Sequence, residues 1–272
     1  MKKIHIAIDY SEASANAVRF AKAWAEDWKL ELEVIHVWFP QVDVERPEVL
    51  IPDARIEQLQ RGQLADFLTK NGVDKERGRL EVGLPTDRLV ALSKEENWEL
   101  LLVGNSGKHG VMDQIFGSVS THLVRYAACP VLSLPADYEY SGSFRKILYA
   151  TDYTATDERS VDQLITFAEK WKSTVHFVHV NTGKGNNKTQ LIEDTLFAKI
   201  FEREAPSFAF EMASIREEDV VKGLSDYINA NQIDLIVMVT PYRDWWDRLW
   251  HKSLTKAMNL SALKPLMVFH LT

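Results

Sequence analysis

Short apolar runs alternate with longer stretches of helical periodicity, and this alternation is the main structural signal in the chain. Apolar residues recur at helical spacing between Ser14 and Ala25, and again between Ile56 and Leu68. The apolar runs of the first half predict strands near residues 3–9, 31–38, 78–83, 99–103 and 130–134. Strands that alternate with helices are typical of a parallel sheet covered by helices on both faces.

Capping residues indicate where two of these helices begin. The side chains of Ser, Thr and Asp accept hydrogen bonds from the free N–H groups of a helix's first turn. We therefore expect Ser11 or Ser14 to cap the first helix, and Thr86 or Asp87 to cap the third.

The whole pattern occurs twice with its parts in the same order, which indicates a duplicated unit. Residues 3–11, 34–37, 99–103 and 129–132 return as residues 146–154, 177–180, 234–238 and 264–267. The segment from Ala136 to Phe144 has the composition of a short linker. The sequence therefore predicts two tandem doubly wound α/β domains, 1–137 and 144–272, each with a five-stranded parallel sheet.

Composition narrows the class of protein. The chain has 272 residues, of which 46% are hydrophobic and 26% charged, and no apolar run is long enough to span a membrane. The net charge of −7, with both signs interspersed, argues against general affinity for nucleic acid. Cys129 is the one cysteine, so no intramolecular disulfide can form; we interpret it as buried and expect a cytoplasmic protein. The histidines show no metal-site spacing, so no metal ligand is predicted.

Candidate chemistry follows the fourth predicted strand. Gly104 and Gly107 come after the apolar run 100–103, and Gly117-Ser118 opens an amphipathic helix. One glycine lets the chain turn sharply at the end of a strand, and a second lets backbone approach a ligand closely. Free N–H groups at the start of a helix favour an anion, most often a phosphate. Taken singly, each glycine is equally well explained as a turn residue.

The spacing G-x2-G-x9-G-S resembles the nucleotide loop of ATP-binding universal stress proteins, and the resemblance covers both halves of the chain. It implies the strand order 3-2-1-4-5, in which the first and fourth strands end at one crevice. It also implies that Asp9 contacts the adenosine of the ligand and that the backbone of Val37 recognises the adenine edge. The alternative for Asp9 is a residue that only bonds backbone at the helix start. The other positions that match the family's nucleotide site are Gly104, Gly107, Lys108, Gly117, Ser118, Val119 and Ser120.

The second copy departs from this pattern. Gly104, Gly107 and Gly117 correspond to Val239, Tyr242 and Lys252, and Ser118 to Ser253. Larger side chains thus replace the glycines where a ligand would approach backbone, and we predict that this copy has lost nucleotide binding. Its aromatic segment contains Trp245, Trp246 and Trp250. These rings either fill the vacant crevice or pack between domains, or they form a patch for a partner or an apolar ligand.

The sequence favours a regulatory stress-response protein that holds one ATP, ADP or AMP in its first domain. Magnesium would be held mostly by phosphates and water, because no acidic cluster lies near the loop. A homodimer of tandem chains and an unidentified protein partner are further expectations, and residues 40–54 are interpreted as an insertion that acts as a lid.

Two alternative functions stay open. One is slow ATP hydrolysis, for which only Lys108, His109 and Asp113 lie nearby and no catalytic residue is assigned; the other is a nucleotide-free interaction module.

Overall fold

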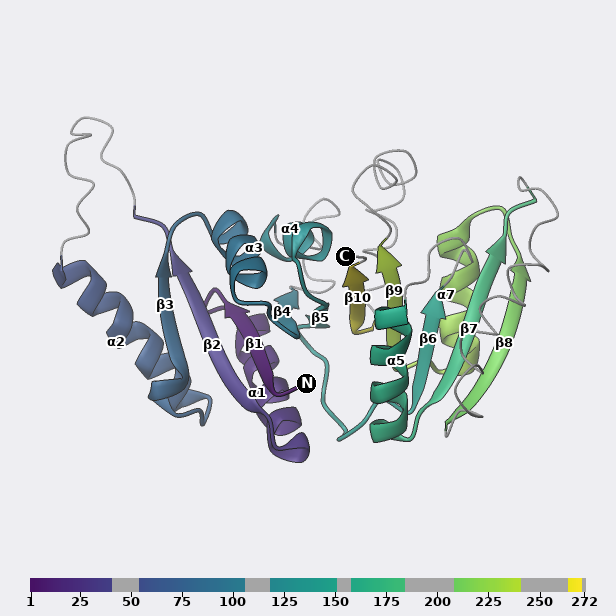
Figure 1. The fold of residues 1–272 in the computed structure, drawn as a ribbon, viewed down its shortest axis with the longest axis horizontal. Coiled ribbons are helices and arrows are strands. Elements are labelled where there is room, and N and C mark those ends of the chain that lie inside the picture. The colour runs from purple at the N-terminus through teal and green to yellow at the C-terminus, as the bar shows by residue number, and fades with distance from the viewer. Residues whose placement is uncertain (41–53, 106–117, 151–157, 184–207, 241–263, 271–272) are drawn as a thin grey trace. The chain divides into compact units, whose positions relative to one another are not determined.

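The computed structural model describes residues 1–40, 54–105, 118–150, 158–183, 208–240 and 264–270. The chain divides into two compact units, Met1–Tyr140 and Ser141–Thr272. In each unit a parallel sheet carries helices on both faces (Figure 1).

The first unit contains all the elements predicted for the first copy. In chain order they are β1 (Lys3–Ile8), α1 (Glu12–Trp28), β2 (Glu31–Trp38), α2 (Ala54–Lys70), the short 3-10 helix η1 (Lys75–Arg77), β3 (Gly78–Val82), α3 (Pro85–Glu95), β4 (Leu101–Asn105), α4 (Ser118–Tyr126) and β5 (Val131–Pro135). The hydrogen-bonded order is β3-β2-β1-β4-β5, and every pair is parallel. The predicted order 3-2-1-4-5 is therefore confirmed. Helix α1 covers one face of this sheet, whereas α3 and α4 cover the other (Figure 1).

Helix α1 packs closely on the centre of the sheet because its buried face carries small residues. Ala13, Ala17, Ala21 and Ala25 recur every four residues and are all buried, so the helix backbone can approach β1 and β4. Trp24, at 0% exposure, fills the space beside the alanines. The start of α1 is thereby held against the carboxyl ends of the two central strands.

The second unit repeats this architecture. Its described elements are β6 (Lys146–Ala150), α5 (Glu158–Trp171), β7 (Thr174–Asn181), β8 (Ala209–Arg216), α7 (Val220–Asn231), β9 (Leu235–Thr240) and β10 (Leu266–His270). The order β8-β7-β6-β9-β10 is again 3-2-1-4-5 when the strands are counted within the unit, and all pairs are parallel. Gly104 pairs with Leu134 in the first unit, and Val239 pairs with Phe269 in the second. The register therefore puts Val239 where the first unit has Gly104.

The structure corrects the bounds of four strands and one cap. Strand β2 has the predicted bounds, whereas β1 and β3 each end one residue earlier, β4 lies two residues later and β5 lies one residue later. Ser11 caps α1 as expected, because its Oγ accepts the N–H of Ser14 at 3.2 Å. The predicted cap of α3 is wrong: Leu84 is its N-cap, and Thr86 and Asp87 lie inside the first turn. A proline at the first helical position starts this helix instead, because its fixed φ suits that position.

Two expectations from composition can be compared with the structure. Cys129 is buried, at 2% exposure, as predicted. Among the described helices, none has the length and apolar character needed to cross a membrane.

Candidate functional site

A cavity of about 580 Å³ lies at the carboxyl ends of β1, β2 and β4 in the first unit. Its wall comes from these strand ends, the first turn of α1, helix α3 and the start of α4. Doubly wound sheets bind ligands at this point, where the strand order reverses. The volume lies within the range of about 300–1,000 Å³ that is usual for small-molecule sites.

The cavity brings together predicted residues that are far apart in the sequence. Asp9, Val37, Gly104, Val119 and Ser120 all line it. Ser118, the first residue of α4, immediately precedes two of them. The other predicted positions, namely Gly107, Lys108 and Gly117, together with His109, Asp113, Trp245, Trp246, Trp250 and most of the 40–54 insertion, lie outside the described residues.

Asp9 fixes the start of α1 with one carboxylate oxygen. Its Oδ1 accepts hydrogen bonds from Ser14 Oγ at 2.6 Å and from the N–H of Ser11 at 3.0 Å. The N–H of Asp9 donates in turn to Ser14 Oγ at 3.0 Å. Both of these bonds to the carboxylate reach Oδ1, and the side chain is exposed at the cavity wall. Asp9 therefore has the structural role at the helix start and also a second oxygen that can accept bonds from a ligand.

The carboxylate of Asp9 is ionised at neutral pH. Partial loss of hydration raises its pKa, but hydrogen bonds from Ser11 and Ser14 outweigh this and hold the pKa below its ordinary value. The Oδ2 atom is thus a charged acceptor, which favours hydroxyl and N–H donors on a ligand and repels anions.

Gly104 has a different role from the one predicted. It lies inside β4 rather than at a turn, so its expected part in turning the chain is wrong. A Cβ at this position would lie 2.6 Å from both the carbonyl carbon and the oxygen of Ala13, and 3.0 Å from the nitrogen of Ser14. The first turn of α1 therefore packs directly on Gly104, and only glycine leaves room for this approach. The glycine thereby holds the partners of Asp9 at the cavity.

Tyr10 follows Asp9 in the chain and packs on His36, which lines the cavity. Tyr10 has a left-handed φ of 64°, and its ring lies 4.3 Å from the ring of His36 and 5.4 Å from that of Phe67. Burial raises the pKa of Tyr10 to about 12. The Nδ1 atom of His36 lies 3.0 Å from the carbonyl oxygen of Ile8, which can only accept, so Nδ1 carries the proton. These packed rings fix the unusual backbone turn between β1 and α1.

Helix α3 contributes two cavity residues that the sequence analysis missed. Pro85 and Leu89 line the cavity, and Leu89 is 2% exposed. Only the topology of the sheet could have predicted these two residues, because the helix after β3 must lie on the same face of the sheet as α4. Spacing along the sequence does not mark them as site residues.

The model of the family described as "Universal stress protein family" matches residues 1–135 and, independently, residues 143–270. The chain belongs to the universal stress protein family. The universal stress protein in the QAH/OAS sulfhydrylase 3′ region of Thermus aquaticus is 30% identical over 133 residues, which cover 48% of this chain and 96% of that protein. Universal stress protein YxiE of Bacillus subtilis is 29% identical over 143 residues, with the same two coverages. These two relatives therefore match one repeat of this tandem member of the family.

A solved structure shares the fold along the full chain. The universal stress protein from Archaeoglobus fulgidus DSM 4304 superposes with a TM-score of 0.72 and covers 98% of both chains. At 14% identity the likeness shows the fold alone. It supports the same fold for each of the two repeats.

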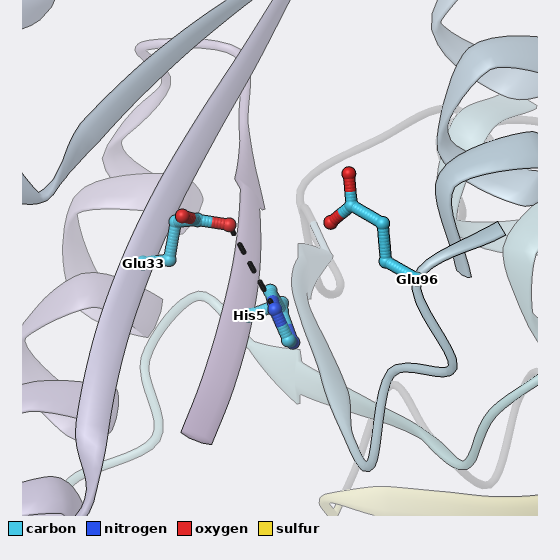
Figure 2. A group of neighbouring side chains, drawn as sticks. All are labelled: His5, Glu33 and Glu96. Carbon is cyan, nitrogen blue, oxygen red and sulfur yellow. Dashed lines mark ion pairs between the residues drawn. The ribbon is translucent and has the colours of Figure 1, made fainter.

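A second polar group of this universal stress protein lies on the α3 side of the sheet, away from the cavity. Ligand atoms of His5, Glu33 and Glu96 lie within 4.8 Å of one another (Figure 2). The His5 side chain is buried, with its Nε2 3.7 Å from Glu33 Oε2 and its ring stacked 4.4 Å from that of Trp98. This set contains the residue types of a metal site, although its members have no metal-site spacing in the sequence.

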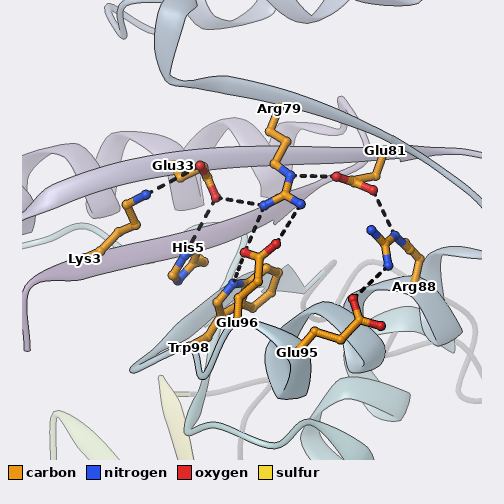
Figure 3. Close-up of polar contacts among 9 residues, drawn as sticks. All are labelled: Lys3, His5, Glu33, Arg79, Glu81, Arg88, Glu95, Glu96 and Trp98. Atoms are coloured by element: carbon orange, nitrogen blue, oxygen red, sulfur yellow. Dashed lines mark hydrogen bonds and ion pairs between the residues drawn. The ribbon is translucent and has the colours of Figure 1, made fainter.

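An arginine already supplies the positive charge in this group. The guanidinium of Arg79 donates to both oxygens of Glu96, at 2.8 and 2.9 Å, and lies 3.6 Å from Glu33 (Figure 3). Hydrogen bonds from Arg79 lower the pKa of Glu96 to about 2, and the same bonds raise the pKa of Arg79 further. A divalent cation would have to displace this permanently charged group. We interpret the group as an ion-pair network rather than a metal centre.

The buried His5 gives a prediction for acid stability. Burial is the main effect and lowers the pKa of His5 from 6.5; Glu33 and Glu96 oppose the shift, and Lys3 adds to it. The unfolded chain therefore binds this proton more tightly, so stability is lost as the pH falls below about 6.5. His5→Phe, which keeps a ring against Trp98, is expected to weaken this pH dependence in urea denaturation at pH 7 and pH 5. Parallel losses of stability in the two proteins would contradict the prediction.

Proposed function

We propose that the first unit binds one adenine nucleotide and that occupancy of this site regulates the protein in the stress response. The observation that carries the proposal is the convergence of Asp9, Val37, Gly104 and the start of α4 on one cavity of suitable volume. The charged carboxylate of Asp9, which is exposed at the cavity wall, supplies a polar group that such a ligand needs.

The residues that line the cavity suit different parts of a nucleotide. They include the apolar residues Val37, Pro85, Leu89 and Val103, against which a flat base can pack. The carboxylate of Asp9 is suited to accept hydrogen bonds from the hydroxyls of a sugar.

The proposal assigns the phosphates to the start of α4 and the preceding loop. The N–H groups at the first turn of α4, beginning at Ser118, favour an anion. Among the described lining residues the charged ones are Asp9 and Glu12, and neither is basic. The proposal therefore requires Gly107, Lys108 and Gly117 to supply further donors, and it leaves magnesium to the phosphates and water.

The second unit is proposed to leave its equivalent crevice without nucleotide. Val239 occupies the register position of Gly104, and Tyr242 and Lys252 correspond to Gly107 and Gly117, so the second copy lacks all three glycines of the loop. A single bound nucleotide would regulate the protein by linkage, favouring whichever conformation or assembly binds it better.

A calorimetric titration of nucleotide-stripped protein tests this proposal. ATP with magnesium is expected to bind at one site per chain, with ADP and AMP as weaker or equal competitors and CTP as the control for the base. Absence of heat and of any thermal stabilisation by all three adenine nucleotides would overturn the proposed function.

A further inference from the structure

Glu81, on β3, joins two arginines with its two carboxylate oxygens (Figure 3). Its Oε1 accepts from Nε of Arg79 at 2.6 Å, and its Oε2 accepts from Nε of Arg88 at 2.8 Å. The remaining nitrogens of Arg79 hold Glu96, which directly follows α3, and Arg88 also donates to Glu95 at 3.3 Å. One carboxylate thus connects the edge strand β3 to both ends of α3.

Helix α3 is the element that brings Pro85 and Leu89 to the cavity. Arg88 directly precedes Leu89 in this helix. The N-cap of α3 is Leu84, whose aliphatic side chain cannot accept a hydrogen bond from the first turn. The bond from Arg88 to Glu81 therefore ties the first turns of α3 to the sheet at the place where a capping side chain would otherwise help to fix them.

The geometry distinguishes this network from an ordinary surface ion pair. The side chains of Glu81, Arg79 and Arg88 are 16%, 28% and 31% exposed, so water screens them only in part. Isolated exposed pairs contribute little, whereas networks with bidentate arginine contacts hold their geometry better. Burial raises the pKa of Glu81, but the two arginines outweigh it and keep this pKa below its ordinary value. The carboxylate thus stays charged at neutral pH.

The second unit fixes the corresponding helix in a different way. Strand β7 corresponds to β2, and its register with β8 puts Ala213 and Ile215 at the positions that Arg79 and Glu81 have in β3. Helix α7, which corresponds to α3, is instead capped by Asp219, which accepts two backbone N–H groups at 2.9 and 3.2 Å. Within the described residues, the Arg–Glu network therefore occurs in the unit that contains the cavity.

We propose that Glu81 is a positioning residue for ligand binding, which sets the place of α3 and hence of Pro85 and Leu89 at the cavity. This inference rests on the proposed function, since it assigns to that site a residue outside the cavity wall. A network of charges on one edge of the sheet thereby controls the fit of an apolar wall to the base of a nucleotide.

The test compares Glu81→Gln with Glu57→Gln in the full chain. Glu57 accepts Nε and Nη2 of Arg61 at 3.0 and 2.8 Å on α2, so the control removes a similar ion pair away from the cavity. The dissociation constant of magnesium-ATP is expected to rise about threefold to tenfold in Glu81→Gln and to stay unchanged in the control. Hydrogen exchange of the α3 amides is expected to become faster in Glu81→Gln only, in protein without nucleotide.

A second variant shows whether Glu81 acts through Arg88. In an Arg88→Met background, Glu81→Gln is expected to add less weakening than it causes alone. Unchanged affinity and unchanged exchange in Glu81→Gln would overturn the inference, as would equal effects in Glu57→Gln. If the wild-type protein fails to bind nucleotide, the proposed function falls. In that case the hydrogen exchange of the α3 amides alone tests whether Glu81 positions the helix. Unchanged exchange in Glu81→Gln would overturn this role.

Discussion

Gly104→Ala is expected to destabilise the protein by about 1–3 kcal/mol, the usual cost of forcing an extra group into a close-packed contact. The added methyl group would lie 2.6 Å from the backbone of Ala13, and backbone cannot move aside as the end of a flexible side chain can. The first turn of α1 must shift instead, taking with it the Ser11 and Ser14 groups that hold Asp9. We therefore expect weaker nucleotide binding together with the loss of stability, measured by urea denaturation and calorimetry.

A glycine-to-alanine substitution elsewhere in the first unit provides a control in which the expected change in stability has the opposite sign. Gly62 lies inside helix α2, and a Cβ there would meet no atom within 4 Å. Gly62→Ala is expected to stabilise the protein by about 0.5–1 kcal/mol, because alanine loses less backbone entropy in a helix. If Gly104→Ala were as harmless as Gly62→Ala, the proposed contact between α1 and β4 would be wrong.

Asp9→Asn is expected to weaken magnesium-ATP binding by about 10-fold to 100-fold while changing stability little. Asparagine keeps an Oδ1 that can accept from Ser11 and Ser14, so the start of α1 retains its hydrogen bonds. Its Nδ2 replaces Oδ2 and presents a donor, without charge, where a ligand hydroxyl would donate. Hydrogen bonds to charged groups contribute about 1.5–3 kcal/mol, which corresponds to the expected range in affinity.

Asp74→Asn is the matched control for this measurement. Asp74 caps η1 by accepting the N–H of Glu76 at 3.0 Å, and it lies outside the cavity wall. The same change of carboxylate to amide is expected to leave the dissociation constant of ATP unchanged. Unaltered ATP affinity in Asp9→Asn would show that Asp9 serves only the helix start, the alternative that the sequence left open.

The fold was largely predictable because its signals are local and repeated. Strands such as β2 are rich in apolar residues, and the recurrence of Val34-Ile35-His36-Val37 as Phe177-Val178-His179-Val180 indicates the duplication from the residues alone. The convergence of Asp9 and Gly104 on one crevice followed from strand order. This order came from the family resemblance, and the sheet confirms it.

The remaining features depend on contacts that sequence spacing does not record. The role of Gly104 was misread because its critical neighbour, Ala13, lies 91 positions away and acts through backbone alone. Glu81, Arg79 and Arg88 form a network only because the pleat of β3 directs alternate side chains toward α3. The glycine-loop residues Gly107, Lys108 and Gly117 lie outside the described residues, so their phosphate contacts remain predictions.

The most direct test of the central claim is to denature freshly purified full-length protein and identify any released nucleotide by chromatography and mass spectrometry. The account predicts an adenine nucleotide at a stoichiometry close to one per chain, because the cavity lies in the first unit and the second copy has Val239, Tyr242 and Lys252 in place of the three loop glycines. Two nucleotides per chain would contradict the assignment to the first unit. No nucleotide, together with no thermal shift on addition of ATP and magnesium, would contradict nucleotide binding itself.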